Sequence, residues 1–413
     1  MSQKNAFYAQ SGGSTAVINT SAAAVIQTAK QHASQINRLY IGKNGIMGAL
    51  QEELYDASAE TDEQIDLLKH TPGCAFGSCR IKLKNVDEQP ALFERLFNVF
   101  KAHDIRYFFY NGGNDSAETI YKISQACEKF NYPLQCIAIP KTIDNDVAVT
   151  DNCPGFASAA KFVATTVREC QLDLQSMCAS STKVFVYEVM GRHSGWLAAA
   201  SGLAEPHIIL FPEITFDQEK FLALVKKHVD HHGYCVIVAS EGVRNAQNKF
   251  LTDHGYQDQF GHTQLGGVAS VLAHMIYQKW QYKYHWATAD YMQRAASHLV
   301  SKIDHEQAYA VGKAAVEFAI AGKHAVMPVI QRTQQSPYQW SIGEANLDQI
   351  ASVEKKLPAK FIDEDRMQIT QQCRDYLEPL IQGEIQTPFH HGLPQYAHLK
   401  KQLVKKQLEA YTH

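Results

Sequence analysis

The sequence lacks the short motifs that identify several common enzyme classes. It has no GxxxxGK[ST] segment, so it is not a P-loop nucleotide-binding protein, and it has no GxGxxG fingerprint of a dinucleotide-binding protein. It also has no HExxH segment, which excludes the zinc proteases that use this helix motif. A site that binds phosphate must therefore be made of other loops.

The chain also has little net charge and no long apolar run. Among its 413 residues the formal net charge is −3, so global charge favours neither a nucleic acid nor an anionic membrane as a partner. No uninterrupted apolar run reaches about 18 residues, the length of a membrane-spanning helix, and the start MSQKNAFYAQ is too polar for a signal peptide. Nine cysteines without a CxxC spacing fit free thiols in a reducing compartment. We expect a cytoplasmic protein.

Seven short apolar runs are predicted to form strands. They are nearly continuously apolar rather than alternating, as in parallel strands that helices cover on both faces. Helical patterns lie between them, and one of these is 217–230, where TFDQ (215–218) offers a capping box. This alternation predicts an α/β protein of the doubly wound type, with one large or two medium domains. The predicted strands are NAFYA (5–9), NRLYI (37–41), IRYFFY (105–110), LQCIAI (134–139), KVFVYEV (183–189), HIILF (207–211) and YCVIVA (234–239).

Five of these strands end in glycine-rich or polar loops. Ligands of open parallel sheets bind beyond the carboxyl ends of the strands, so these loops predict one shared site. We place a domain boundary near Pro154–Gly155, and the segment LKKQLVKKQLEA (399–410) is predicted to form an amphipathic helix. The loops are QSGGSTAVINT (10–20), YNGGNDS (110–116), IPKTIDND (139–146), EVMGRHSG (188–195) and ASEGVRN (239–245).

The loop PKTIDND (140–146) has the highest density of chemically active side chains. Its carboxylates, Asp144 and Asp146, flank an amide. One of them could take a proton from a sugar hydroxyl, or the pair could bind Mg²⁺. An Asx-rich turn that caps the next helix explains the same residues. The loop alone leaves these three interpretations open.

Three further segments carry cations or a carboxylate. In EVMGR, Gly191 permits close approach of a ligand to the backbone, and Arg192 supplies a forked donor for phosphate. In SEGVR, Glu241 could hold sugar hydroxyls or cap a helix. GSCR (77–80) and YMQR (291–294) each end in an arginine, and an ordinary surface arginine remains the alternative for both.

Together these segments resemble the phosphofructokinase family, whose members phosphorylate fructose 6-phosphate at its 1-hydroxyl. The segments GG, GSxR, GGxxS, TIDND, EVMGR, EG and QR follow the family's order and spacing from residue 12 to 294. The resemblance implies two doubly wound, mostly parallel-sheet domains of phosphofructokinase type, with the active site in the cleft between them. It implies that residues 1–155 plus about 293–345 bind the phosphoryl donor. Residues 156–292 plus 346–413 would bind the sugar phosphate.

The resemblance also implies roles for single residues. Asp144 matches the general base for the sugar hydroxyl, and Lys183 matches a cation that reaches the neighbouring subunit, so we expect a homodimer or homotetramer with a shared site. Tyr291 stands where many members have histidine. The positions that match the sugar-phosphate site are Thr142, Ile143, Asp144, Lys183, Met190, Gly191, Arg192, Glu241, Tyr291 and Arg294.

The donor site departs from that of ATP-using members. Their loop reads GGDG where this chain has GGND, and they carry glycine at the position of Lys141. Asp115 would therefore place a carboxylate where the α-phosphate of ATP lies, while Lys141 would hold pyrophosphate together with Gly13 and Arg80. Members with Asp and Lys at these two positions resemble pyrophosphate-dependent enzymes. We predict reversible transfer to fructose 6-phosphate in glycolysis or gluconeogenesis, with Asp144, Lys141, Asp115 and Arg192 as the catalytic residues.

The resemblance implies Mg²⁺ as cofactor, with Asn114 at the position of a metal-binding aspartate. An amide oxygen is an uncharged and weaker ligand, so Asp115 or Asp144, with oxygens of the substrate, is an alternative. Two other functions are alternatives: an ATP-dependent phosphofructokinase and a non-catalytic, sugar-phosphate-binding regulatory subunit. Asp115 with Lys141 argues against the first, and the retained Asp144 argues against the second.

Overall fold

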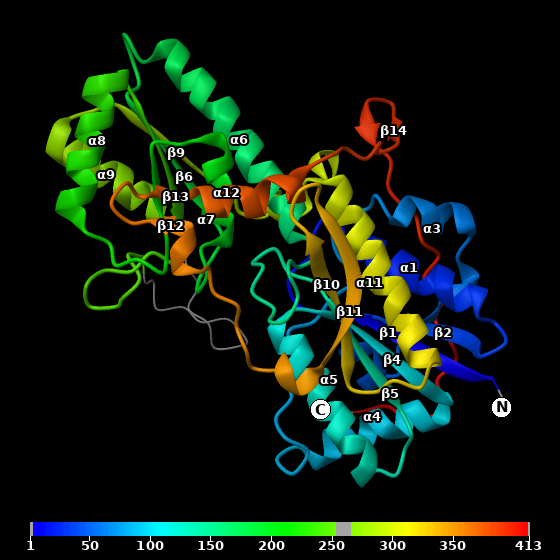
Figure 1. Ribbon diagram of the computed structural model, residues 1–413. Helices are drawn as coiled ribbons and strands as arrows, with labels where there is room; N and C mark the ends of the chain where they lie inside the picture. The colour runs from blue at the N-terminus through cyan, green and yellow to red at the C-terminus, as the bar shows by residue number, and fades with distance from the viewer. Residues whose placement is uncertain (1–2, 253–265, 412–413) are drawn as a thin grey trace.

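The computed structural model describes residues 3–252 and 266–411, which form two lobes (Figure 1). Each lobe is built on its own β-sheet with helices on both faces, so the structure confirms the predicted α/β fold. Within the described ranges, no helix is both long enough and apolar enough to cross a membrane.

The first lobe contains a seven-stranded sheet in the order β11-β10-β5-β4-β1-β2-β3. The five inner strands are parallel, and an antiparallel strand lies at each edge. Side chains alternate along β1, with Phe7 and Ala9 on one face and Ala6 and Tyr8 on the other, so both faces are buried. The strands are β1 (Lys4–Gln10), β2 (Ile36–Gly42), β3 (Leu54–Asp56), β4 (Ile105–Gly112), β5 (Gln135–Pro140), β10 (Val326–Gln334) and β11 (Gln339–Asn346).

Helices cover both faces of this sheet. α1 (Ile18–Gln31) and α11 (Lys302–Ile320) pack on the face that carries Ala6 and Tyr8. α4 (Pro90–Ala102) and α5 (Asn114–Lys129) pack on the opposite face. Shorter helices of this lobe are α2 (Ile46–Leu50) and α3 (Asp62–Leu68).

The second lobe contains a four-stranded, fully parallel sheet in the order β7-β8-β6-β9. α6 (Phe156–Met177) and α7 (Trp196–Ser201) contribute to the core on one face, and α8 (Gln218–His232) and α9 (Val268–Trp280) contribute to the core on the other. The strands are β6 (Val184–Val189), β7 (Ile208–Leu210), β8 (Cys235–Ser240) and β9 (Tyr284–Thr288). The seven predicted strands therefore correspond to β1, β2, β4, β5, β6, β7 and β8.

The chain crosses between the lobes several times (Figure 1). It enters the second lobe at α6, close to the boundary predicted at Pro154–Gly155, and returns through α10 (Met292–Ala295) to α11. Asp304 of α11 accepts hydrogen bonds from the backbone nitrogens of Gly155 and Ser158 at 2.9 Å each. A carboxylate of the first lobe thus caps the helix that begins the second lobe.

The last hundred residues belong partly to each lobe. α12 (Gln371–Leu377) and the hairpin of β12 (Ile362–Asp363) and β13 (Gln368–Ile369) contact the second lobe. A second hairpin follows, of β14 (Phe389–His390) and β15 (Leu393–Pro394).

The final segment, residues 397–411, corrects two expectations. It packs on the first lobe rather than the second, and its residues 399–410, predicted to form an amphipathic helix, contain no helix. Val404 donates from its backbone nitrogen to the Leu54 oxygen at 2.9 Å, and buried Glu52 accepts from the backbone nitrogens of Gln407 and Leu408 at 2.6 and 3.1 Å. These distant partners satisfy the backbone, which a helix would satisfy internally. Residues 1–2, 253–265 and 412–413 of the predicted domain ranges lie outside the described residues.

Candidate active site

A cavity of about 490 Å³ lies between the lobes. It is located beyond the carboxyl ends of β1, β4 and β5 in the first lobe and of β6 and β8 in the second, as the loop pattern predicts. All of the predicted site residues line it except Gly191 and Lys183. Those that do are Gly13, Arg80, Asn114, Asp115, Lys141, Thr142, Ile143, Asp144, Met190, Arg192, Glu241, Tyr291 and Arg294.

Lys141 forms a buried cation in the first-lobe wall. Its side chain lies at the end of β5 with 3% of the residue exposed, and its Nζ donates to the Gly13 oxygen at 2.5 Å. Gly12 has φ +75°, and a Cβ placed on it would lie 3.4 Å from this Nζ. Burial lowers the pKa of Lys141 to about 8, against the opposing influence of Cys74 and Asp144. Lys141 therefore fills the space beside the Gly12–Gly13 turn with a cation that titrates near neutral pH.

Asp144 lies next to this cation on the same loop. Its backbone nitrogen donates to Thr142 Oγ1 at 3.0 Å, and that hydroxyl lies 3.4 Å from Asp144 Oδ2. Burial raises the pKa of Asp144, and Lys141 and the Thr142 hydrogen bond oppose the rise. Burial, together with the charge of Asp144, raises the pKa of Asp146 to about 7. A carboxylate with a raised pKa is suited to take up a proton near neutral pH.

Asn114 begins α5 and offers an unused acceptor. Its Nδ2 donates to the Asp146 backbone oxygen at 3.3 Å, while its Oδ1 is buried without a hydrogen-bond partner. Asn114, Asp144 and Asp146 all line the cavity. Carboxylate and amide oxygens are the donor atoms that hard divalent cations prefer, so these residues fit a Mg²⁺ ion.

Asp115 lies in the first turn of α5, where a carboxylate stabilises the helix N-terminus. Its side chain is 38% exposed, and its Oδ1 lies 3.9 Å from Lys82 Nζ. Asp115 lines the cavity, so its charge is within the space that a donor would occupy.

The second-lobe wall contains Arg192 and Glu241. At Gly191, which has φ +143°, the backbone packs tightly against Ser194 and Ser240. A Cβ at this position would lie 2.7 Å from the Ser194 oxygen and 2.8 Å from Ser240 Oγ, so only glycine fits. The backbone nitrogen of Gly191 lies 3.4 Å from Glu241 Oε1. Burial raises the pKa of Glu241 to about 7, and Arg192 opposes the rise. Arg192 Nε is buried without a hydrogen-bond partner, so it is available to an anionic ligand.

Arg294 reaches from α10 toward the first lobe. Its guanidinium carbon lies 4.1 Å from the centre of the Tyr291 ring. A Cβ placed on Gly13 would lie 3.0 Å from Arg294 Nη1 and 3.9 Å from Arg80 Nη2. Arg80 and Arg294 thus both lie at the Gly12–Gly13 turn, which makes this end of the cavity strongly cationic.

Lys183 does not line the cavity. It precedes β6, whose six residues span roughly 20 Å to the loop of Arg192. Its Nζ donates to the Cys178 oxygen, and its backbone nitrogen donates to the Lys283 oxygen at 2.8 Å. Lys183 is therefore too far away to serve the cavity of its own chain.

The cavity also contains residues that the motifs did not indicate as part of the site. Most of them are neighbours of predicted residues within the same loops, so the loops themselves were the available signal. Glu354 is different, because it belongs to the C-terminal part of the chain, where no motif was found. These additional lining residues are Ser11, Ser14, His193, Ser194 and Glu354, whereas the lining residues Gly12, Gly113, Ser116 and Asp146 belong to the motifs themselves.

Three histidines form a separate cluster on the second lobe. The candidate ring nitrogens of His207, His228 and His232 lie within 4.8 Å of one another. However, Nδ1 of His207 accepts a hydrogen bond from the Val236 backbone nitrogen at 3.0 Å. This bond uses the single lone pair of a neutral imidazole, so the cluster offers only two histidines ready to bind a metal.

Comparison with known proteins places this geometry in a family. The family model described as Phosphofructokinase matches residues 5–319. The chain is 56% identical to two proteins named pyrophosphate–fructose 6-phosphate 1-phosphotransferase. The match to the protein from Methylococcus capsulatus covers 99% of each chain, and the match to the protein from Halomonas elongata covers 100% of each chain. A crystal structure of a pyrophosphate-dependent phosphofructokinase from Marinobacter aquaeolei is similar with a TM-score of 0.91 and 56% identity, covering 99% of this chain and 100% of that one.

Proposed function

The chain belongs to the phosphofructokinase family, and we propose that it transfers a phosphoryl group reversibly from pyrophosphate to the 1-hydroxyl of fructose 6-phosphate. The products are fructose 1,6-bisphosphate and phosphate. The full-length similarity to relatives with this name supports the proposal. The observation that carries it is Lys141, whose buried ammonium fills the space beside the Gly12–Gly13 turn.

The donor specificity follows from charge and volume. ATP-using members have small residues at the positions of Asp115 and Lys141, which leave room for the α-phosphate and the nucleoside. Here a carboxylate repels the additional phosphate, and the lysine narrows the space. Pyrophosphate ends before this obstruction, and Lys141 and Arg80 offset its charge.

In the forward reaction Asp144 orients the 1-hydroxyl and takes up its proton as the hydroxyl oxygen attacks the terminal phosphorus of pyrophosphate. Phosphoryl transfer passes through a loose transition state, so the protein acts mainly by positioning the reactants and stabilising charge. Arg192 and Lys141 supply that positive charge from opposite walls. Glu241 holds hydroxyls of the sugar. In the reverse direction Asp144 returns its proton.

A divalent cation fits beside these residues. Asn114 Oδ1 and the carboxylates of Asp144 and Asp146 would hold Mg²⁺, which would neutralise charge on the phosphoryl oxygens. We also infer a homodimer or homotetramer, because Lys183 lies on the far side of β6 from its own cavity and would serve the site of a neighbouring subunit. All nine cysteines are free, which supports a cytoplasmic location. The proposed reaction, which is reversible, supports a role in glycolysis or gluconeogenesis.

A coupled assay of the purified protein tests the proposal. Fructose 6-phosphate and longer sugar phosphates are each offered with pyrophosphate or ATP in the presence of Mg²⁺. We expect turnover with pyrophosphate and fructose 6-phosphate, and little with ATP. Equal rates with the two donors would refute the account of Asp115 and Lys141. The absence of turnover with either donor would favour the regulatory-subunit alternative.

A further inference from the structure

The turn that carries the general base has an unusual backbone. Asn145 lies between Asp144 and Asp146, is completely buried, and has φ +54°, in the left-handed region. Asparagine tolerates this region better than most residues, but the conformation still needs support from its surroundings. The two carboxylates on either side of Asn145 depend on it for their direction.

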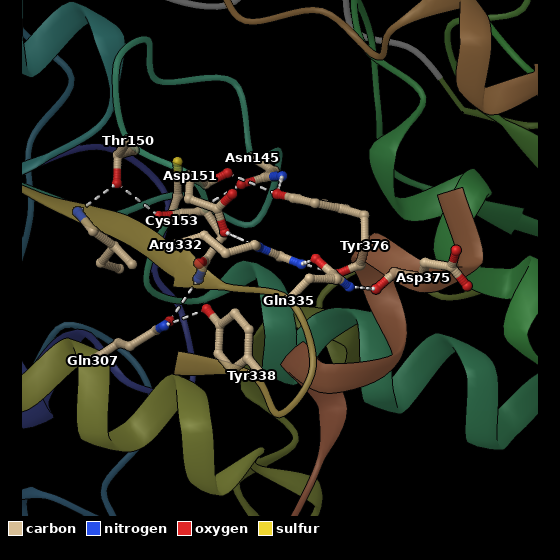
Figure 2. Close-up of polar contacts among 12 residues, drawn as sticks. Asn145, Thr150, Asp151, Cys153, Gln307, Arg332, Gln335, Tyr338, Asp375 and Tyr376 are labelled. Carbon is tan, nitrogen blue, oxygen red and sulfur yellow. Dashed lines mark hydrogen bonds and ion pairs between the residues drawn. The ribbon is translucent and has the colours of Figure 1, made fainter. Parts of the chain in front are cut away.

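Side chains from the C-terminal part of the chain provide this support. Asn145 Nδ2 donates to the Tyr376 hydroxyl at 3.0 Å (Figure 2), and Asn145 Oδ1 accepts from Lys355 Nζ at 3.3 Å. The same Oδ1 also accepts from the backbone nitrogen of Cys153 at 3.0 Å. The amide is therefore held from three sides, and two of its three partners follow residue 350.

Lys355 is bound to this loop through its backbone and its side chain. Its Nζ also donates to the backbone oxygens of Thr150 and Asp151 at 3.0 and 2.8 Å. Its backbone nitrogen donates to the Asp146 oxygen at 2.7 Å, and its own oxygen accepts from Trp196 Nε1 at 3.2 Å. One lysine thus links both ends of the loop 145–151 to the core of the second lobe.

Tyr376 completes the support. Its hydroxyl donates to the Asp151 oxygen at 2.7 Å while it accepts from Asn145. Its ring lies 4.5 Å from the Arg332 guanidinium and 5.3 Å from the Trp196 ring. The ring is therefore held by packing, and the hydroxyl contacts both arms of the turn.

We propose that Lys355 and Tyr376 are positioning residues, which hold the Asn145 turn so that the carboxylates of Asp144 and Asp146 point into the cavity. They act through Asn145 and do not contact a substrate. The inference rests on the proposed function, and it gives the C-terminal part of the chain a role in catalysis that no motif indicates.

Tyr376→Phe is the deciding variant, because it removes one hydroxyl and keeps the packed ring. Misplacing a reacting group by a fraction of an ångström lowers the rate of the chemical step, so we expect kcat to fall roughly tenfold to a hundredfold. Both KM values should change by less than about threefold, because the binding residues are untouched. Because partial unfolding would also lower the apparent kcat at constant KM, the rate is divided by the folded fraction of each variant, measured by circular dichroism under the assay conditions.

Tyr338→Phe is the matched control. The Tyr338 ring also lies near the Arg332 guanidinium, at 4.8 Å, and its hydroxyl accepts a hydrogen bond from Gln307 at 3.0 Å (Figure 2). Gln307 in turn accepts a hydrogen bond from Asn152, so the Tyr338 hydroxyl reaches the end of the loop only through Gln307. We expect its kcat to stay within about twofold of the original protein, since an outer hydrogen bond has a small net effect. Equal losses of kcat in the two variants would overturn the inference, and so would an unchanged kcat in Tyr376→Phe.

Amide hydrogen exchange provides a readout that does not depend on turnover. We expect peptides covering residues 142–153 to exchange faster in Tyr376→Phe, and in Lys355→Met if that variant folds, than in the original protein or in Tyr338→Phe. If the original protein does not turn over pyrophosphate, the proposed function is wrong, whereas exchange still tests whether these residues hold the turn. Unchanged exchange of this loop in Tyr376→Phe would refute the positioning role.

Discussion

The two walls of the cavity each pair a buried carboxylate with a cation, but the cations differ in kind. On the first-lobe wall Asp144 lies near Lys141, whose pKa burial lowers to about 8. On the second-lobe wall Glu241 lies near Arg192, and a guanidinium stays charged throughout the physiological range. The two cations therefore differ, because Lys141 can lose its proton near pH 8 whereas a guanidinium keeps its charge, while the carboxylate of the second wall, Glu241, itself has a pKa raised to about 7. We propose that proton transfer and the choice of phosphoryl donor depend on the first wall, and that recognition of the sugar phosphate depends on the second.

Replacing the carboxylate of the first wall should have the largest effect. In Asp144→Asn the side chain keeps its shape but cannot accept a proton, so we expect kcat to fall roughly a thousandfold. Binding of fructose 6-phosphate, measured by isothermal titration calorimetry, should persist. A variant with a near-normal rate would show that another group is the base.

Replacing Asp115 and Lys141 of the first wall by glycine should change the selectivity between ATP and pyrophosphate. In the double variant Asp115→Gly, Lys141→Gly, the space and charge that exclude ATP are altered. We expect the ratio of kcat/KM for ATP to that for pyrophosphate to rise at least about tenfold, from the removal of one repulsive charge and one bulky side chain. Steady-state assays with both donors measure this ratio, and Lys82→Ala, which removes only the neighbour of Asp115, is the control. If the ratio does not rise, other residues exclude the nucleotide.

The corresponding change on the second wall should affect binding instead. In Glu241→Gln we expect KM for fructose 6-phosphate to rise roughly tenfold at pH 8, above the Glu241 pKa of about 7, since a charged hydrogen-bond acceptor becomes neutral. KM for pyrophosphate should stay nearly constant. A variant in which both KM values rise equally would contradict the proposal that the second wall binds the sugar phosphate and the first wall binds the donor.

The smallest effect should come from pH. Lys141 is protonated below its pKa of about 8 and neutral above it, so kcat/KM for pyrophosphate should decline several-fold between about pH 7.5 and 9. In Lys141→Met this decline should disappear. The titration of Lys141 does not itself destabilise the fold: an unfolded lysine binds its proton up to about pH 10.4, so this group makes the fold more stable as pH rises through that interval. Cys74, Asp144, Arg80 and Arg294 face the same ammonium and will modulate the midpoint.

The sequence predicted the parts of the site that are local in the chain. Lys141 and Asp144 lie in one loop after one strand, so periodicity and motif sufficed to bring them together. Lys355 and Tyr376 hold the same loop from more than 200 residues away, and neither carries a pattern of its own. The segment 397–411 has helical spacing of apolar residues, but its backbone binds Leu54 and the carboxylate of Glu52 instead. Local pattern cannot reveal such partners, because the preference arises only after the sheet has formed.

The bridge between Tyr55 and Leu403 has a consequence for biosynthesis. Within this sequence Tyr55 leaves the ribosome well before Leu403, so the edge of the first lobe is completed only after most of the second lobe has been made. The β10 and β11 strands on the opposite edge also emerge late. All the strands of the second-lobe sheet precede residue 289, so this sheet can form while the first-lobe sheet still lacks β10 and β11 at one edge and Leu403 at the other. The nascent chain must keep this incomplete sheet from pairing with other chains until β10, β11 and Leu403 have emerged.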